Sequence, residues 1–320
     1  MMDLILTILS KVFTVTFFQK AVTQGVPLLF GATGEILTEK AGNLNLGIPG
    51  IMYMGAVGGL TGAFFYEQST PEPSGAVGVL IAFLCAILFS AFGAFIYALL
   101  TITLRANQNV TGLALTTFGI GVGNFIGGSL SKIAGTAGQI TVYTTGQAFR
   151  TTIPGLSQIP VVGPLLFSYG FLTYLSLALA LFFAYLLART RCGLNLRAVG
   201  ENPATADAAG INVTAYRYLA TCIGGGISGL GGCYYVMVYI RGTWENQGTI
   251  EALGWLAVAL VIFATWKPLR NIWGSYLFGA LYWAYFYIPG LTRSSQEIFK
   301  MIPYLVTLFV LITVSLRKKK

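Results

Sequence analysis

Long apolar runs separated by short polar stretches recur along the whole chain. Five of these runs contain no charged residue: residues 41–66, 76–104, 106–131, 218–240 and 271–292. Each run has at least the roughly 20 residues that a helix needs to cross about 30 Å of hydrocarbon. Because a helix satisfies its own backbone hydrogen bonds in lipid, the pattern predicts membrane-spanning helices.

The apolar periodicity predicts an all-α integral membrane protein, a single domain over residues 1–320 with about nine (eight to ten) spanning helices. A further short helix at residues 2–12 would move the N-terminus to the other side of the membrane. The predicted helices lie near residues 14–37, 46–65, 76–104, 108–129, 166–188, 214–239, 251–267, 272–288 and 300–316.

The composition agrees with lipid as the solvent. The chain is 55% hydrophobic and 9% charged, with a mean hydropathy of +0.74, too apolar for a soluble surface. It has no histidine, and its four cysteines form no CxxC pair, so we expect no metal site. The net charge of +9 lies in short loops without interleaved aromatic residues, which argues against nucleic-acid binding.

The basic residues are unevenly divided between the two sides of the predicted bundle. Lys and Arg concentrate in cytoplasmic loops, so the richer side, with twelve residues against five, predicts a cytoplasmic C-terminus. The twelve are Lys40, Arg105, Arg189, Arg191, Arg197, Arg217, Lys267, Arg270, Arg317, Lys318, Lys319 and Lys320; the five are Lys132, Arg150, Arg241, Arg293 and Lys300.

Two long connections interrupt the helices: residues 130–165 on the predicted outer side and residues 189–213 on the inner side. In the inner one, Asn202 followed by Pro203 is a helix start, and Gly210 is a typical helix end. A helix of about seven residues is too short to be stable alone in water. It is either an ordinary capped turn or an element that a partner holds.

Two stretches carry a family resemblance. LRAVGENPATADAAGI (196–211) closely resembles the coupling-helix segment of permease subunits in ATP-binding cassette importers of the branched-chain amino acid, ribose and nucleoside class. GEILTEKAGNLNLGIPGIMYMGA (34–56) resembles the nucleoside and simple-sugar branch of those permeases. With the helix layout, the likeness covers most of residues 20–316.

The resemblance implies a permease in a bacterial cell membrane. Its implied partners are a second, related permease, cytoplasmic ATPases, and an extracellular lipoprotein or periplasmic binding protein. The segment that would receive motion from the ATPase consists of Gly200, Glu201, Asn202, Pro203, Ala206, Asp207 and Gly210.

Catalytic motifs are missing from the sequence. The chain contains no Gly-Lys dipeptide, which the phosphate-binding loop of an ATPase requires. We therefore expect ATP and Mg²⁺ on a partner chain and no cofactor here. A membrane enzyme is the least supported alternative, since there is also no histidine and no nucleophile elbow.

Uncharged polar residues inside apolar runs are candidates for a solute path. Asn43 and Asn45, between glycines and Pro49, suit a broken helix beside a cavity, or else a plain turn. Further candidates, which helix-to-helix contacts would explain equally well, are Asn107, Asn109, Thr111, Asn124 and Phe118.

The polar candidates favour a neutral solute. We expect Glu35 and Glu251 to reach water from helix ends, which argues against an ion-coupled secondary transporter. The leading prediction is inward transport of nucleosides, and the alternative is a pentose or another small neutral solute.

Overall fold

The computed structural model describes residues 14–135, 140–152, 154–160, 162–244, 248–288 and 292–318. These residues are helical apart from connections and one antiparallel bridge between Thr141 and Thr243. Six described helical stretches are long and apolar enough to cross a membrane. They are Ile48–Ser69 (α3), Gly75–Thr103 (α4, Gly75–Ala98, with a π-helical turn), Gln108–Ile133 (α5), Phe171–Arg189 (α7), Val213–Tyr239 (α10, Val213–Tyr234, with a π-helical turn) and Ser294–Thr313.

Three more helices complete the predicted nine. α2 (Val15–Lys40) is long but carries four charged side chains, and α11 (Thr249–Phe263) and α12 (Pro268–Ala284) have 15 and 17 residues. The prediction of an all-α membrane bundle is confirmed, whereas a count of about nine is only approximate. Shorter helices are α6 (Tyr143–Phe149), α8 (Arg191–Glu201), α9 (Pro203–Ala208) and α13 (Arg293–Lys300), which precedes α14 (Ile302–Lys318).

The core of the bundle is built by α2, α3 and α10. In the apolar windows of α3 and α10, 83% of residues are buried, against 28% for α4 and 33% for α7, whose apolar side chains face outward. A Cβ on Gly55 of α3 would lie 2.3 Å from the carbonyl oxygen of Gly229 on α10. The glycines therefore bring these helix backbones into direct contact, as small residues do in lipid.

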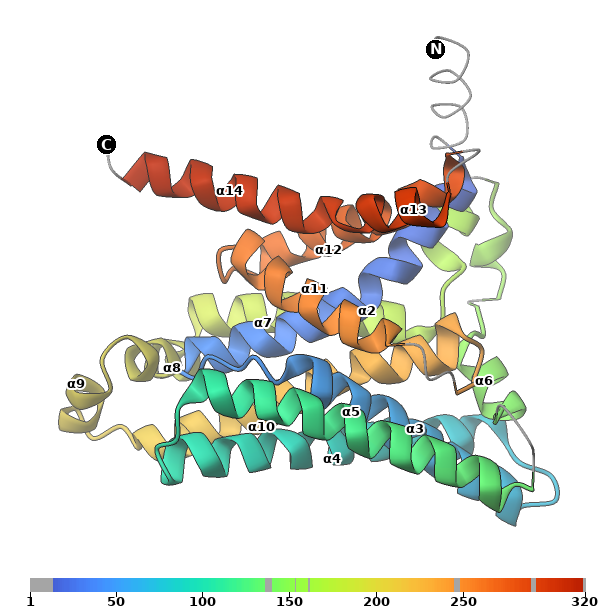
Figure 1. Cartoon of the computed structure of the whole chain (residues 1–320), viewed down its shortest axis with the longest axis horizontal. Helices are drawn as coiled ribbons and strands as arrows, with labels where there is room; N and C mark the ends of the chain where they lie inside the picture. The colour runs from blue at the N-terminus through green and yellow to red at the C-terminus, as the bar shows by residue number, and fades with distance from the viewer. Residues whose placement is uncertain are drawn as a thin grey trace, which may run out of the picture.

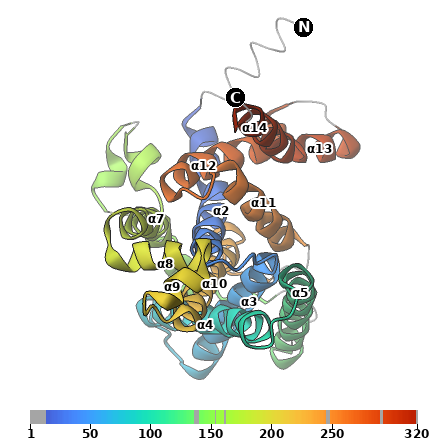
Figure 2. The ribbon, with the colours of Figure 1, turned by 90° about the vertical axis from the view of Figure 1, so that its left-hand side faces the viewer.

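The helices run between two ends of the molecule, which we name after the short helix that each contains (Figure 1). α9 lies at the end where α2 and α7 finish and where α10 begins. α6 lies at the opposite end. Seen from the α9 end, α5 and α11 lie on the same side of α3, and α14 lies beyond α11 (Figure 2).

Several predicted boundaries need correction. The predicted connection 130–165 contains the last turn of α5, then α6 and two short helical turns, Leu156–Gln158 and Gly163–Phe167. The predicted helix 166–188 begins later, at Phe171, after Gly170, and the predicted helix 300–316 is preceded by the separate helix α13. The possible helix at residues 2–12 lies outside the described residues.

Candidate functional site

The inner connection folds into two helices, α8 and α9, where the sequence predicts one. Thr190 caps α8 through a bond from the Gly193 amide to its hydroxyl (3.1 Å). α9 begins as predicted, since the Asn202 side-chain oxygen accepts a hydrogen bond from the Thr205 amide (3.1 Å) and Pro203 is the first helical residue.

α9 also ends where predicted, after six residues. Gly210 has a φ of +78°, a left-handed conformation that favours glycine. Its amide donates to the Asp207 carbonyl (2.8 Å), and the Ile211 amide donates to the Ala206 carbonyl (3.0 Å). These two bonds form a Schellman motif, which closes the helix without further partners.

The α9 segment presents polar groups to its surroundings. Ala206 is buried, whereas Glu201, Asn202, Asp207 and Gly210 are exposed. In the described part of the chain, neither Glu201 nor Asp207 takes part in a salt bridge. The two carboxylates are therefore available to a partner at this end.

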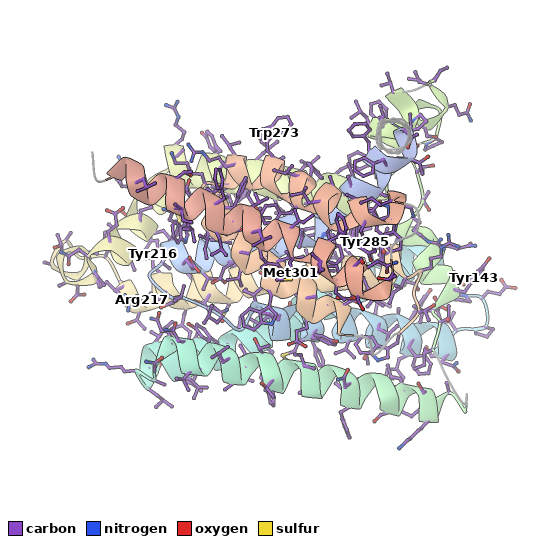
Figure 3. The ribbon with its side chains drawn as sticks, turned by 45° about the horizontal axis from the view of Figure 1, so that its top comes forward. Tyr143, Tyr216, Arg217, Trp273, Tyr285 and Met301 are labelled. Atoms are coloured by element: carbon purple, nitrogen blue, oxygen red, sulfur yellow. The ribbon has the colours of Figure 1, made fainter. Side chains whose placement is uncertain are left out.

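α8 is seated on the connection between α2 and α3, residues 41–47, which we call the α2–α3 loop. A Cβ on Gly200 would lie 2.2 Å from the Lys40 carbonyl oxygen, so the backbones touch. Arg217 at the start of α10 donates to the Ala41 carbonyl (3.3 Å), and the Asn195 amide donates to the Tyr216 hydroxyl (3.0 Å). Figure 3 shows Tyr216 and Arg217 together at this end.

Most of the α2–α3 loop is itself buried or half-buried, with only Leu44 exposed. Asn43 and Asn45 are 1% and 0% exposed. The Asn43 amide donates to the Thr221 hydroxyl of α10 (3.0 Å), and the Asn45 backbone amide donates to a Glu35 carboxylate oxygen (3.1 Å). Glu35 is completely buried, so the expectation that it reaches water is wrong: the loop folds back over it.

Two further helices hold the loop. The Tyr97 hydroxyl of α4 donates to the Leu44 carbonyl (2.5 Å), and the Gln108 side chain of α5 accepts from the Leu44 amide (2.9 Å). The Thr116 hydroxyl of α5 donates to the Leu46 carbonyl (2.9 Å). Residues of α2, α4, α5 and α10 thus fix this loop, and α8 rests on it.

Comparison with known proteins identifies the family. Residues 17–311 match the family described as "Branched-chain amino acid transport system / permease component". The chain belongs to this permease family. It is therefore a transport component rather than an enzyme, in a system that also contains a partner ATPase and a binding protein.

Three relatives narrow the class to nucleoside and sugar permeases. The chain is 35% identical to the nucleoside ABC transporter permease protein NupC of Lactococcus lactis subsp. cremoris (89% of this chain, 87% of the relative). It is 36% identical to the putative glucose ABC transporter permease protein TsgC13 of Haloferax volcanii (79% and 72%). It is 34% identical to the guanosine ABC transporter permease protein NupQ of Bacillus subtilis (79% and 76%). No solved structure matches this permease.

The permease fold does not gather the predicted path residues into one cavity. Asn43 and Asn45 lie inside the α2–α3 loop. Thr111 and Phe118 line a groove of about 340 Å³ between α5 and the end of α4. The exposed pair Asn107 and Asn109 lies at the start of α5, where the Asn107 side chain accepts from the amides of Asn109 and Val110 (3.0 and 3.2 Å), and the half-buried Asn124 lies farther along α5.

The sequence gives no local signal for the residues that clamp the loop. Glu35 is predicted as a water-reaching carboxylate, and Tyr97 and Thr221 lie in ordinary apolar runs. Gln108 is a polar residue at a helix start, where water is the expected partner. Only the folded chain places them around residues 41–47.

Proposed function

We propose that this permease moves nucleosides inward across a bacterial cell membrane, with ATP hydrolysed, together with Mg²⁺, by partner ATPases. The observation that carries the proposal is the seat of α8, which leads directly into α9, on the α2–α3 loop. A partner that moves α9 also moves a loop to which α2, α4, α5 and α10 are bonded.

The ATPase would contact the exposed part of the α9 segment. Glu201, Asn202, Asp207 and Gly210 form its accessible surface, Pro203 starts the helix, and Ala206 anchors it. Gly200 transmits displacement through its backbone contact with Lys40. Because packed helices shift as rigid elements, a small displacement here reaches the far end of each helix.

The α9 end is the cytoplasmic end in this proposal, which puts the C-terminus inside. Arg105, Arg189, Arg191 and Arg217 lie on helix ends or connections at this end, in agreement with the positive-inside rule. An external lipoprotein or periplasmic binding protein would dock at the α6 end, and a second, related permease would lie alongside.

A nucleoside as the substrate is supported by two of the three relatives, which are named for nucleoside or guanosine transport. Uncharged polar groups such as Asn124, Thr111 and Asn109 suit hydroxyl-rich and base-bearing solutes, with Phe118 as a ring for stacking. A sugar is the second candidate, favoured by the putative glucose permease among the relatives.

Uptake experiments test the substrate and the energy source. Labelled uridine and guanosine are offered to cells with and without the chain, before and after ATP depletion, with excess ribose or glucose as competitor. We expect uptake to require both the chain and ATP and to resist the sugars. Competition by a sugar would indicate that the substrate is a sugar. ATP-independent uptake would contradict the proposal of an ATP-driven importer.

A substitution at the α8 seat tests coupling. Gly200→Ala puts a methyl group against the Lys40 carbonyl oxygen, so we expect uptake per ATP hydrolysed to fall at least tenfold in reconstituted complexes. Gly121→Ala is the control, because a Cβ there has no neighbour within 4 Å. Equal uptake per ATP in the two variants would remove Gly200 from the coupling route.

A further inference from the structure

A basic groove lies between the end of α2, the helices α7 and α8, and the turn from α11 to α12. Its volume is about 440 Å³. Four cationic side chains line it: Lys40, Arg197, Lys267 and Arg270. They come from three separate parts of the chain, namely the end of α2, α8 and the start of α12, so the fold, rather than a local run of charges, brings them together.

The four cations outnumber the acids beside them in the described part of the permease, where the Glu39 carboxylate interacts electrostatically with Lys40. None of them takes part in a salt bridge there. The Arg197 Nε atom is buried without a hydrogen-bond partner, and Arg270 donates to the Thr265 hydroxyl (2.8 Å) rather than to an acid. The nearby Glu39 carboxylate accepts a bond from the Trp266 indole. A buried guanidinium nitrogen without an acceptor favours an anionic ligand.

The remaining lining is apolar. Ala184, Leu187 and Ala188 of α7 face Trp266 and Leu269 across the groove. The apolar surface continues along α12, where Leu269, Trp273 and Leu277 are exposed, Trp273 by 80%. Figure 3 shows Trp273 projecting away from the bundle. The site is therefore a basic cluster that opens onto an exposed apolar helix surface.

The turn between α11 and α12, which supplies Trp266 and Lys267 to the groove, has an energetically unfavourable backbone conformation. Thr265 and Trp266 both have left-handed φ values, +51° and +53°. Such conformations cost about 1 kcal/mol or more for residues other than glycine. This geometry places Trp266 and Lys267 at the groove, at the level where aromatic and basic side chains meet lipid headgroups.

We propose that this groove binds the phosphate headgroup of an anionic phospholipid. The four cations hold the phosphate, and an acyl chain lies on the outer surface of α7 and α12. An acidic surface of a soluble partner would match the charges alone, whereas a phospholipid matches both the charges and the adjoining exposed apolar surface. The proposal does not depend on which solute is transported.

Lipid retention by the purified permease complex tests the proposal. Native mass spectrometry compares retained phosphatidylglycerol with phosphatidylcholine after both are added in detergent. We expect preferential retention of phosphatidylglycerol, and a loss of about 30-fold in the double variant Lys267→Gln/Arg270→Gln, since each basic residue contributes about fivefold. Arg189→Gln/Arg191→Gln is the matched control, because it removes the same charge at the same end outside the groove.

Each outcome decides the proposal. The swap Lys267→Arg/Arg270→Lys keeps the charge and is expected to keep the lipid, which separates loss of the site from misfolding. Equal retention in the groove and control variants, or equal retention of both lipids, would overturn the site. Displacement by inorganic phosphate would assign the groove to a soluble anion, and displacement by the partner ATPase would assign it to a protein interface, each overturning the lipid assignment.

Discussion

The two connections that flank α3 have opposite characters. The α2–α3 loop, residues 41–47, is largely buried and bonded to side chains of α2, α4, α5 and α10. The α3–α4 connection, residues 70–74, is largely exposed, and the Ser74 amide in it donates a hydrogen bond to the Tyr66 hydroxyl (3.0 Å). One connection is part of the core, and the other joins two helices across the surface.

The difference shows where movement can be transmitted. A connection held from four sides cannot shift without shifting its neighbours, because protein interiors are close-packed. The exposed connection can change shape freely and transmits little. At the α9 end of the permease, a displacement of the α2–α3 loop would therefore also displace the helices bonded to it. α8 rests on this loop.

We expect the largest difference between the two connections in their tolerance of inserted residues. Two residues, Gly-Ser, inserted after Leu44 displace Asn45 from Glu35 and Leu46 from Thr116. We expect no folded protein in the membrane fraction, measured by fluorescence-detected size exclusion. The same insertion after Glu72 should leave a monodisperse peak, because exposed connections tolerate added residues. Similar tolerance at both places would show that the α2–α3 loop is not held as described.

The next largest difference between the two connections is expected in the stability cost of adding a single carboxylate. Asn45→Asp keeps the acceptor for the Gly47 amide (2.9 Å) but adds a second buried acid beside Glu35. An uncompensated buried charge costs about 3–5 kcal/mol, so we expect a loss of that size in the free energy of unfolding, measured by denaturation in mixed detergent.

Ser74→Asp is the exposed counterpart and should change this free energy by less than about 0.5 kcal/mol. Equal losses would mean that burial of the α2–α3 loop does not set the response.

Local chemistry made much of the fold predictable. The nine apolar segments match the long helices, and Asn202, Pro203 and Gly210 mark the ends of α9, because spans and caps depend on residues close in sequence. α8 was not predicted, since residues 189–201 are rich in charge and read as a polar connection. Its position depends on tertiary contacts, among them the seat of Gly200 on the α2–α3 loop and the bond from Asn195 to Tyr216.

The clamp around the α2–α3 loop was not predictable for the same reason. Leu44 and Tyr97 are 53 residues apart, and Asn43 and Thr221 are 178 apart, so no local pattern pairs them. Glu35 lies five residues before the end of α2, where exposure is the usual outcome. Only the fold of the loop over α2 buries it.

The smallest expected effect comes from removing one helix hydroxyl that bonds to each connection. Tyr97→Phe deletes the part-buried bond to the Leu44 carbonyl, and Tyr66→Phe deletes the exposed bond from the Ser74 amide. A carbonyl shielded from water and left without a donor costs about 1–2 kcal/mol, whereas water replaces the exposed bond at little cost. We therefore expect Tyr97→Phe to lower the free energy of unfolding by about 1–2 kcal/mol and Tyr66→Phe by less than about 0.5 kcal/mol.

The hydrogen-exchange rate of the Asn45 amide reports on the α2–α3 loop alone. If the helices hold the loop as one unit, Tyr97→Phe should increase this rate. Unchanged exchange there would mean that each helix holds the loop independently, which would weaken the case for shared movement.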